Sequence, residues 1–362
     1  YTVVTGKNTL RALIQESPWI QFLFPFAITI SLMWPAWIST AGNILAVSLG
    51  MPEKGIIFSL LLLGGLLTLW QSKRSYSIIE MIAKGGLLCV LFIVGYTLYR
   101  LFNANTIYTS FVTGTFIPHG SDALLFISAL AYGGVAGVLN LVQSDWVKNK
   151  GYAAAGVASP ESIKWENIET KKAWGAWWRL IVHEHAWLFL FGNIVGILML
   201  GSLAALTLSG TSAKGFGILA FQVQELNTLA APLGSLFGIG VCLIFIMAQM
   251  AILDASGHLL KHSIEDKTAL THKRLSQGIG LIGMGILAIT FFFPKFNQPA
   301  VLLQISAALS AAIMAIYPPL LLRINKKLPK EVRPQLRHSL GIWLCSLFYG
   351  AVTIWAIYHI TL

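Results

Sequence analysis

The residues with the clearest potential for chemistry lie in the stretch 126–156, FISALAYGGVAGVLNLVQSDWVKNKGYAAAG. Gly133, Gly134 and Gly137 interrupt an apolar run there, and Asn140 follows them. Glycine costs a helix interior about 1 kcal/mol relative to alanine, so three glycines within five residues need a reason. They suit close packing between membrane helices, or a helix broken inside the membrane, where freed carbonyl groups coordinate ions in transporters. The residues alone leave both interpretations open.

A second group of ionisable residues, His183, Glu184 and His185, lies in the apolar stretch RLIVHEHAWLFLFGN. The histidines are two positions apart and point to roughly opposite sides of a helix, whereas a zinc His-Glu-x-x-His helix needs a spacing of four. A metalloprotease is therefore disfavoured. An acid inside a membrane span is typical of a proton relay, so we expect Glu184, with His183 beside it, to relay protons or ions. The alternative is an ion pair between Glu184 and Arg179 or a histidine.

Two further stretches place polar side chains among apolar ones. In IMAQMAILDASGHLLKHS, Gln249 and Asp254 are followed by Gly257 and His258, a pattern that indicates a helix end at the membrane interface. In LLQISAALSAAIMAIYPPLLLRINKKLP, Gln304 either lines a cavity or hydrogen-bonds a neighbouring helix.

Motifs for nucleotide or acyl chemistry are absent from the sequence, which has no P-loop, no dinucleotide-binding glycine fingerprint and no nucleophile elbow. Cys89, Cys242 and Cys345 are isolated in apolar segments, so they offer no metal spacing and no disulfide framework. We therefore expect neither an enzyme nor an ATP-driven pump that works alone, and we expect no bound cofactor.

The composition indicates an all-α polytopic membrane protein. Only 11% of the 362 residues are charged and 56% are hydrophobic, whereas a soluble domain carries about 25% charged residues. The apolar runs are continuous and about 20 residues long, which predicts membrane helices rather than the alternating strands of a barrel. The first run contains Pro25 and Pro35 and is too long for one straight crossing, so we expect a kink or tilt there. We predict nine spans, at 18–49, 55–71, 76–100, 122–143, 174–208, 229–253, 277–293, 299–322 and 339–360.

The net charge of +11 is distributed in a way that favours a membrane topology over nucleic-acid binding. On the nine-span scheme, 20 of the 25 Lys and Arg residues fall in loops on one side, and the opposite loops hold Lys54, Lys214 and Lys295. By the positive-inside rule the basic side is cytoplasmic. The N-terminal segment is then cytoplasmic, the C-terminus is external, and residues 144–173 form a cytoplasmic loop.

Four stretches together resemble the Nramp superfamily of metal-ion transporters, and in particular its divergent Nramp-related branch. They occur in the same order as in that family, and the resemblance covers essentially the whole chain. The stretches are VVTGKNTLRAL, GGVAGVLNLVQSDWVKNKGY, QMAILDASGHL and AIMAIYPPLLLRINKKLPKEVRP.

The resemblance implies a LeuT-like helix bundle of two inverted five-helix repeats and an extra helix. The nine spans then correspond to the third to eleventh of eleven, so residues 1–362 form one transmembrane domain without its first two helices. The family's sixth span, broken at mid-membrane, corresponds to the fourth span here. The resemblance implies an ion site lined by these residues, with Gln304 facing the other four: Gly134, Ala136, Gly137, Asn140 and Gln304.

One departure from the family bears on the ion. Classical members have Met-Pro-His in the sixth span, where this sequence has Ala136, Gly137 and Val138. Without a thioether or an imidazole, a harder ion such as Mg²⁺ is favoured over Mn²⁺ or Fe²⁺. The acid and amide of the family's first span are also missing, so we expect residues upstream of Tyr1.

The sequence as a whole therefore predicts a secondary transporter of divalent metal cations, Mg²⁺ or Mn²⁺-like, in a prokaryotic inner membrane. It would work by alternating access, with protons as the candidate coupling ion. The expected partners are the lipid bilayer, the cation and protons, and a partner chain if the first two helices are encoded separately. The alternative function is a non-transporting membrane subunit or scaffold that retains the Nramp-like fold.

Overall fold

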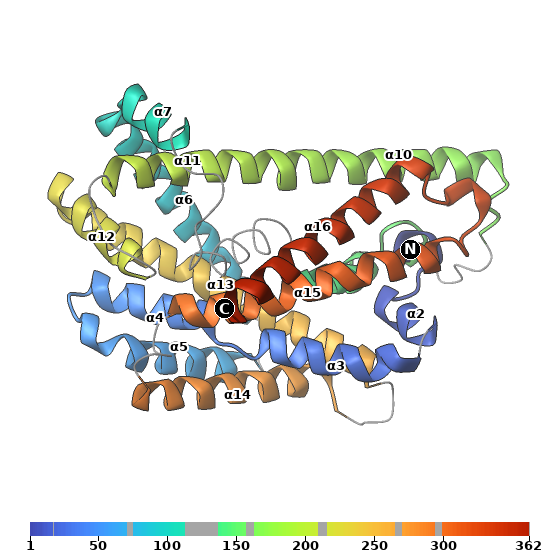
Figure 1. Ribbon diagram of the computed structural model, residues 1–362, viewed down its shortest axis with the longest axis horizontal. Helices are drawn as coiled ribbons and strands as arrows, with labels where there is room; N and C mark the ends of the chain where they lie inside the picture. Colours follow the sequence, from blue (N-terminus) through green and yellow to red (C-terminus); the bar gives the residue numbers. More distant parts are fainter. Residues whose placement is uncertain are drawn as a thin grey trace.

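The computed structural model describes residues 1–16, 18–70, 75–112, 137–156, 163–208, 216–264, 270–293 and 299–361. Every regular element among these residues is helical, as the apolar runs predict. Seven helices in these described ranges are long and apolar enough to cross a membrane, so the chain is an integral membrane protein of the all-α class. Together the helices form an elongated bundle (Figure 1).

The α-helices have these bounds in chain order: α1 Thr2–Thr5, α2 Thr9–Glu16, α3 Pro18–Leu32, α4 Ala36–Ser48, α5 Gly55–Leu69, α6 Ser75–Leu101, α7 Ala104–Val112, α9 Gln143–Asn149, α10 Ile168–Glu184, α11 Gly192–Thr207, α12 Gly217–Leu229, α13 Leu233–Ser263, α14 His272–Phe292, α15 Pro299–Asn325 and α16 Leu336–Thr361. Short 3₁₀ helices cover Pro52–Lys54, Gly137–Val142, Ala153–Gly156 and Lys330–Val332. A π-helix over His185–Phe191 joins α10 to α11.

The seven long helices correspond to seven of the nine predicted spans. The first predicted span, 18–49, is instead divided into α3 and α4, each of which is too short to cross a bilayer alone. The fourth, 122–143, lies mainly in 113–136, outside the described residues. The predicted loop 144–173 contains α9, a 3₁₀ turn and the first residues of α10.

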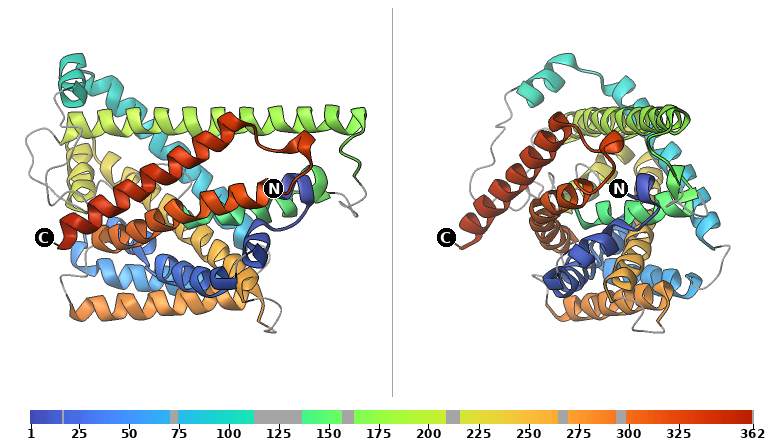
Figure 2. Two further views of the ribbon diagram at one scale, coloured as in Figure 1. Left: turned by 45° about the vertical axis from the view of Figure 1, so that its right-hand side comes forward. Right: turned by 90° about the vertical axis from the view of Figure 1, so that its right-hand side faces the viewer.

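Helix α13 is at the centre of the bundle, where it packs against α3, α4, α6, α12 and α14 (Figures 1 and 2). Small residues allow close contacts between α13 and α4, and also between α4 and α5. A Cβ atom on Gly238 would lie 2.0 Å from Oγ of Ser48 in α4, and one on Gly42 would lie 2.1 Å from Oγ of Ser59 in α5. These approaches are typical of membrane helices, whose association depends on close packing rather than on the exclusion of water.

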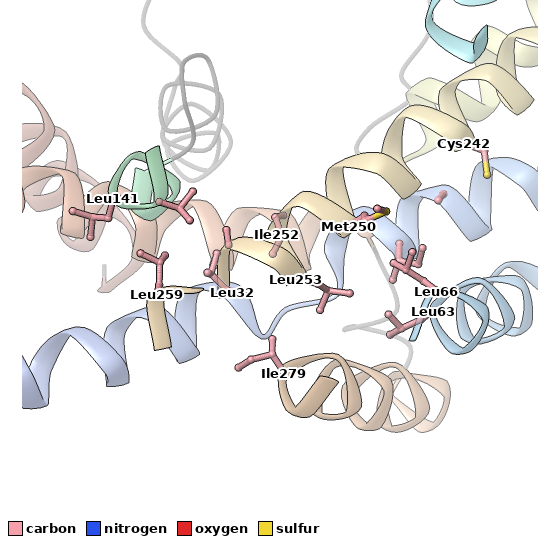
Figure 3. Packing of buried hydrophobic residues seen from close by; sticks show 14 of the residues in the cluster. Leu32, Leu63, Leu66, Leu141, Cys242, Met250, Ile252, Leu253, Leu259 and Ile279 are labelled. Carbon is pink, nitrogen blue, oxygen red and sulfur yellow. The ribbon is translucent and has the colours of Figure 1, made fainter. Parts of the chain in front are cut away.

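One continuous apolar cluster joins α13 to the helices around it. Leu253 and Leu259 of α13, Leu32 at the end of α3 and Leu141 of the 3₁₀ helix are all buried members of this cluster (Figure 3). The core therefore runs along most of α13, and the 3₁₀ helix Gly137–Val142, which precedes α9, packs on it.

One end of the bundle gathers positive charge, and we call it the basic end. It contains the C-terminus of α13, the N-terminus of α14, α9 and α2 (Figure 1). Glu16 of α2 there forms an ion pair with Lys327 and lies 3.8 Å from Arg323. The residues that give this end its charge are Lys7, Lys148, Lys261, Lys273, Arg323 and Lys327.

The predicted fifth span forms part of one long rod over 168–207, made of α10, the π-helix and α11. At 1.5 Å per residue its 40 residues extend about 60 Å, roughly twice the thickness of the hydrocarbon layer. Neither α10 nor the π-helix has a buried residue. The rod thus lies along one side of the bundle (Figure 2).

Candidate functional site

The first predicted span is interrupted in the middle. Helix α3 ends at Leu32 and α4 begins at Ala36, and the residues between them, 33–35, have no regular structure. The interruption occurs at Pro35, whereas Pro25 lies inside α3. It divides residues 18–48 into two helices of 15 and 13 residues. We refer to residues 33–35 as the helix break.

Proline chemistry explains why the helix does not continue through this point. Pro35 has no N–H group, so the carbonyl oxygen of Ser31 loses the donor that a helix would supply four residues later. The first N–H groups of α4 likewise have no partner in their own helix. One of them, Ile38 N–H, donates to Oε1 of Gln249 in α13 at 3.4 Å, and Gln249 is only 3% exposed.

The surroundings of the helix break are largely buried. Pro35 and Ala36 are buried, and the Nε1 donor of Trp34 is buried without a hydrogen-bond partner among the described residues. Helix α14 comes close at Gly283, where an added Cβ would lie 3.3 Å from the carbonyl oxygen of Met33. Backbone carbonyls, an indole donor and the Gln249 amide therefore gather at a buried point of the bundle.

The expected ion site in the fourth span is only partly within the described residues. Gly134 and Ala136 lie outside them, and so does the side chain of Gln304, whose backbone is in α15. Gly137 begins a 3₁₀ helix that ends at Val142, and Asn140 is a partly exposed residue within it. The inner end of this span thus departs from α-helical geometry, as a broken helix would.

The expected relay residues lie on the long rod. His183 is exposed, and its Nδ1 lies 2.7 Å from the carbonyl oxygen of Arg179. Glu184 is partly buried at the junction of α10 with the π-helix. Within the part of the chain that the structure describes, neither side chain has a hydrogen bond or ion pair with another helix. The relay role of both residues stays a prediction.

A polar cluster at the basic end was not anticipated from the sequence. Asp145 of α9 is 5% exposed, and its Oδ1 atom lies 2.7 Å from Nε2 of His262 in α13. Asn8 Nδ2 donates to the same oxygen at 3.0 Å. Two turns of α13 supply Asp254 and His258, and α14 supplies His272, whose ring stacks on His258 with centroids 4.5 Å apart. A visible sequence signal was the spacing of four between His258 and His262.

The interface expected near Asp254 does not end the helix. Helix α13 continues for nine more residues to Ser263, so Asp254, His258 and His262 lie at successive turns along one side of it. We refer to Asp145, Asp254, His258, His262 and His272 as the His–Asp cluster. Its nitrogen and oxygen atoms are ligands for divalent metal ions in general.

Comparisons of the chain with protein-family models and with curated proteins found no match.

Proposed function

We propose that this chain is a secondary transporter of divalent metal cations that works by alternating access, with a LeuT-like arrangement of its helices. Its resemblance to the Nramp-related branch suggests this function. The observation that carries the proposal is the helix break in a span that packs directly on the central helix α13. Discontinuous helices near the bilayer midplane form the substrate and coupling-ion sites of many secondary transporters.

The helix break leaves backbone groups without partners in their own helices. A non-helical segment at membrane depth is tolerated only where it is buried in protein or lines an aqueous cavity. At about 1.5 Å per residue, each of α3 and α4 is about 20 Å long, so the break between them falls near the middle of a crossing. The negative end of the α3 dipole at this point favours a cation, and the Gln249 amide oxygen offsets the positive N-terminus of α4 by accepting from Ile38 N–H.

The fourth span supplies the second half of the proposed pathway. The 3₁₀ helix Gly137–Val142 supports an interruption there, and its Leu141 packs in the same apolar cluster as Leu32 at the end of α3. We assign Gly134, Ala136, Gly137 and Asn140, with Gln304 opposite, to the cation path of this span. The expected orientation, with the basic end in the cytoplasm of a prokaryote, remains part of the proposal.

Flux measurements test this function directly. The purified full-length chain is reconstituted into liposomes that contain a fluorescent indicator for divalent cations, and Mg²⁺ or Mn²⁺ is added outside. We expect saturable uptake, and we expect Gln249→Leu to reduce it at least about tenfold, since one lost polar contact to an ion costs of the order of 1.4 kcal/mol or more.

The matched control is Gln222→Leu. Gln222 of α12 is also a buried glutamine, 6% exposed, and it is not part of the helix break. Unchanged uptake in Gln249→Leu, or an equal loss of uptake in both variants, would show that the helix break is not part of the ion pathway. Absence of uptake for the unmodified chain, with correct folding shown by a single gel-filtration peak, would favour the scaffold function instead.

A further inference from the structure

The His–Asp cluster contains two histidines with a spacing typical of metal ligation. His258 and His262 are four positions apart near the end of α13, so both side chains project from one side of the helix. Two histidines at this spacing supply two zinc ligands on the helices of metalloproteases. Asp145 approaches them from α9, and one ligand atom from each of the three residues lies within 4.8 Å of the others.

The separation of these atoms is close to that of a filled site. Zinc–nitrogen and zinc–oxygen bonds are about 2.1 Å long, so two ligands of one ion are at most about 4.2 Å apart. Nε2 of His262 and Oδ1 of Asp145 already lie 2.7 Å apart in a hydrogen bond, so a bound ion would replace this contact after rotation of the side chains.

Asp145 provides an independent indication of a ligand. Its Oδ1 atom accepts from Asn8 and contacts His262, but its Oδ2 atom is buried without a hydrogen-bond partner among the described residues. An unpartnered buried oxygen of a carboxylate costs about 1–3 kcal/mol or more. A bound cation would satisfy that oxygen, which a structural Asp145–His262 hydrogen bond alone leaves unpaired.

The surrounding residues orient the three ligands. Asn8 Nδ2 donates both to Oδ1 of Asp145 and to Oγ of Ser144, at 3.0 and 2.9 Å, which helps to fix the carboxylate. Hydrogen bonds of this kind to ligating carboxylates raise metal affinity. Asp254 Oδ1 lies 3.8 Å from Nε2 of His258. The negative charges of the Asp254 and Asp145 carboxylates together balance the two positive charges of the ion.

We propose that Asp145, His258 and His262 bind one divalent transition-metal ion at the basic end of the bundle. Imidazole nitrogen with carboxylate oxygen suits Zn²⁺ and its neighbours, whereas Mg²⁺ and Ca²⁺ prefer ligands that are all oxygen. The site is separate from the helix break and does not depend on transport. It joins Asp145 of α9 to histidines of α13 that are more than 100 positions away in the sequence.

A second set of ligands, Asp254, His258 and His272, shares His258 with the proposed site. A single imidazole nitrogen binds one ion, so the two sets exclude each other. We favour the set with Asp145 because its carboxylate is buried and oriented, whereas the side chain of Asp254 is 26% exposed. The stacked ring of His272 then supports His258 from the side.

Binding to the detergent-purified full-length chain, stripped with a chelator, tests the site without any need for transport. Calorimetry with Zn²⁺ and visible absorption of bound Co²⁺ are expected to show one ion per chain. We expect Asp145→Asn, His258→Ala and His262→Ala each to weaken binding at least about tenfold, and His272→Ala to weaken it less. His338→Ala, which removes a histidine that contacts only Trp178 among the described aromatic rings, is the matched control.

Thermal unfolding separates a lost ligand from a lost fold. A saturating concentration of Zn²⁺ should raise the midpoint of the unmodified chain, because an ion that binds only the folded state stabilises it. The same addition should leave the midpoint of Asp145→Asn unchanged. No Zn²⁺ binding by the unmodified chain, or binding that His272→Ala abolishes and Asp145→Asn preserves, would overturn the proposed ligand set.

Discussion

Asn8 and Asp145, 137 positions apart in the sequence, form a buried hydrogen bond of 3.0 Å. Oδ1 of Asn8 also accepts from the N–H of Arg11 in the first turn of α2, so one amide both caps that helix and anchors the carboxylate of α9. Because the same carboxylate contacts His262, this single residue links α2, α9 and α13 at the basic end.

Asn8→Ala should therefore destabilise the protein by about 2–4 kcal/mol. The substitution removes a helix cap, worth roughly 1 kcal/mol, and leaves the buried Ser144 and Asp145 oxygens without their donor, at about 1–3 kcal/mol. Thermal or denaturant unfolding in one fixed detergent measures the change. The control is Asn167→Ala, because Asn167 caps α10 in the same way but is exposed. Equal losses for the two variants would contradict the proposed role of Asn8.

Gly42→Ala should weaken the contact between α4 and α5. The added Cβ would lie 2.1 Å from Oγ and 2.3 Å from the backbone nitrogen of Ser59, so the helices must separate. Overpacking of this kind typically costs 1–3 kcal/mol. Gly65→Ala in α5 meets no atom within 4 Å and should instead stabilise the helix by up to about 1 kcal/mol. Opposite shifts of the unfolding midpoint are expected, and a shift of the same sign in both variants would refute this packing argument.

Glu184→Gln should abolish the pH dependence of cation uptake while leaving the folded state intact. The reason is the relay proposed for Glu184, since glutamine retains the shape of the side chain but carries no exchangeable charge. Uptake into liposomes at several external pH values is the measurement. His338→Gln, on α16, serves as a control for the loss of a titratable group elsewhere. Coupling that is preserved in Glu184→Gln would exclude the relay.

The spans could be predicted well from the sequence because a long apolar run has few possible structures other than a membrane helix. The composition alone indicated helices, and seven predicted spans correspond to long apolar helices. The end of α13 was harder to place. Asp254, Gly257 and His258 were interpreted as marking an interface, but a helix with charged and polar residues continues where other elements provide hydrogen-bond partners, as Asp145 does for His262.

The polar sites were much less predictable than the spans. A kink near Pro35 follows from proline chemistry, but the partner that satisfies Ile38, Gln249, is 211 positions away. The His258–His262 spacing was visible in the sequence, whereas its third ligand, Asp145, is brought close only by tertiary structure, in which the 3₁₀ helix Gly137–Val142 before α9 packs on α13. Contacts of such long range are determined by tertiary packing and leave no local pattern.

The central helix α13 gives these two places a fixed spacing along one element. Gln249 and His258 lie on one helix that contains no proline from Leu233 to Ser263, at a separation of nine residues, or about 13 Å along the axis. The helix break and the His–Asp cluster therefore share one continuous hydrogen-bonded backbone. At Gln249 this backbone is joined to that of α4, because Oε1 of Gln249 accepts from Ile38 N–H.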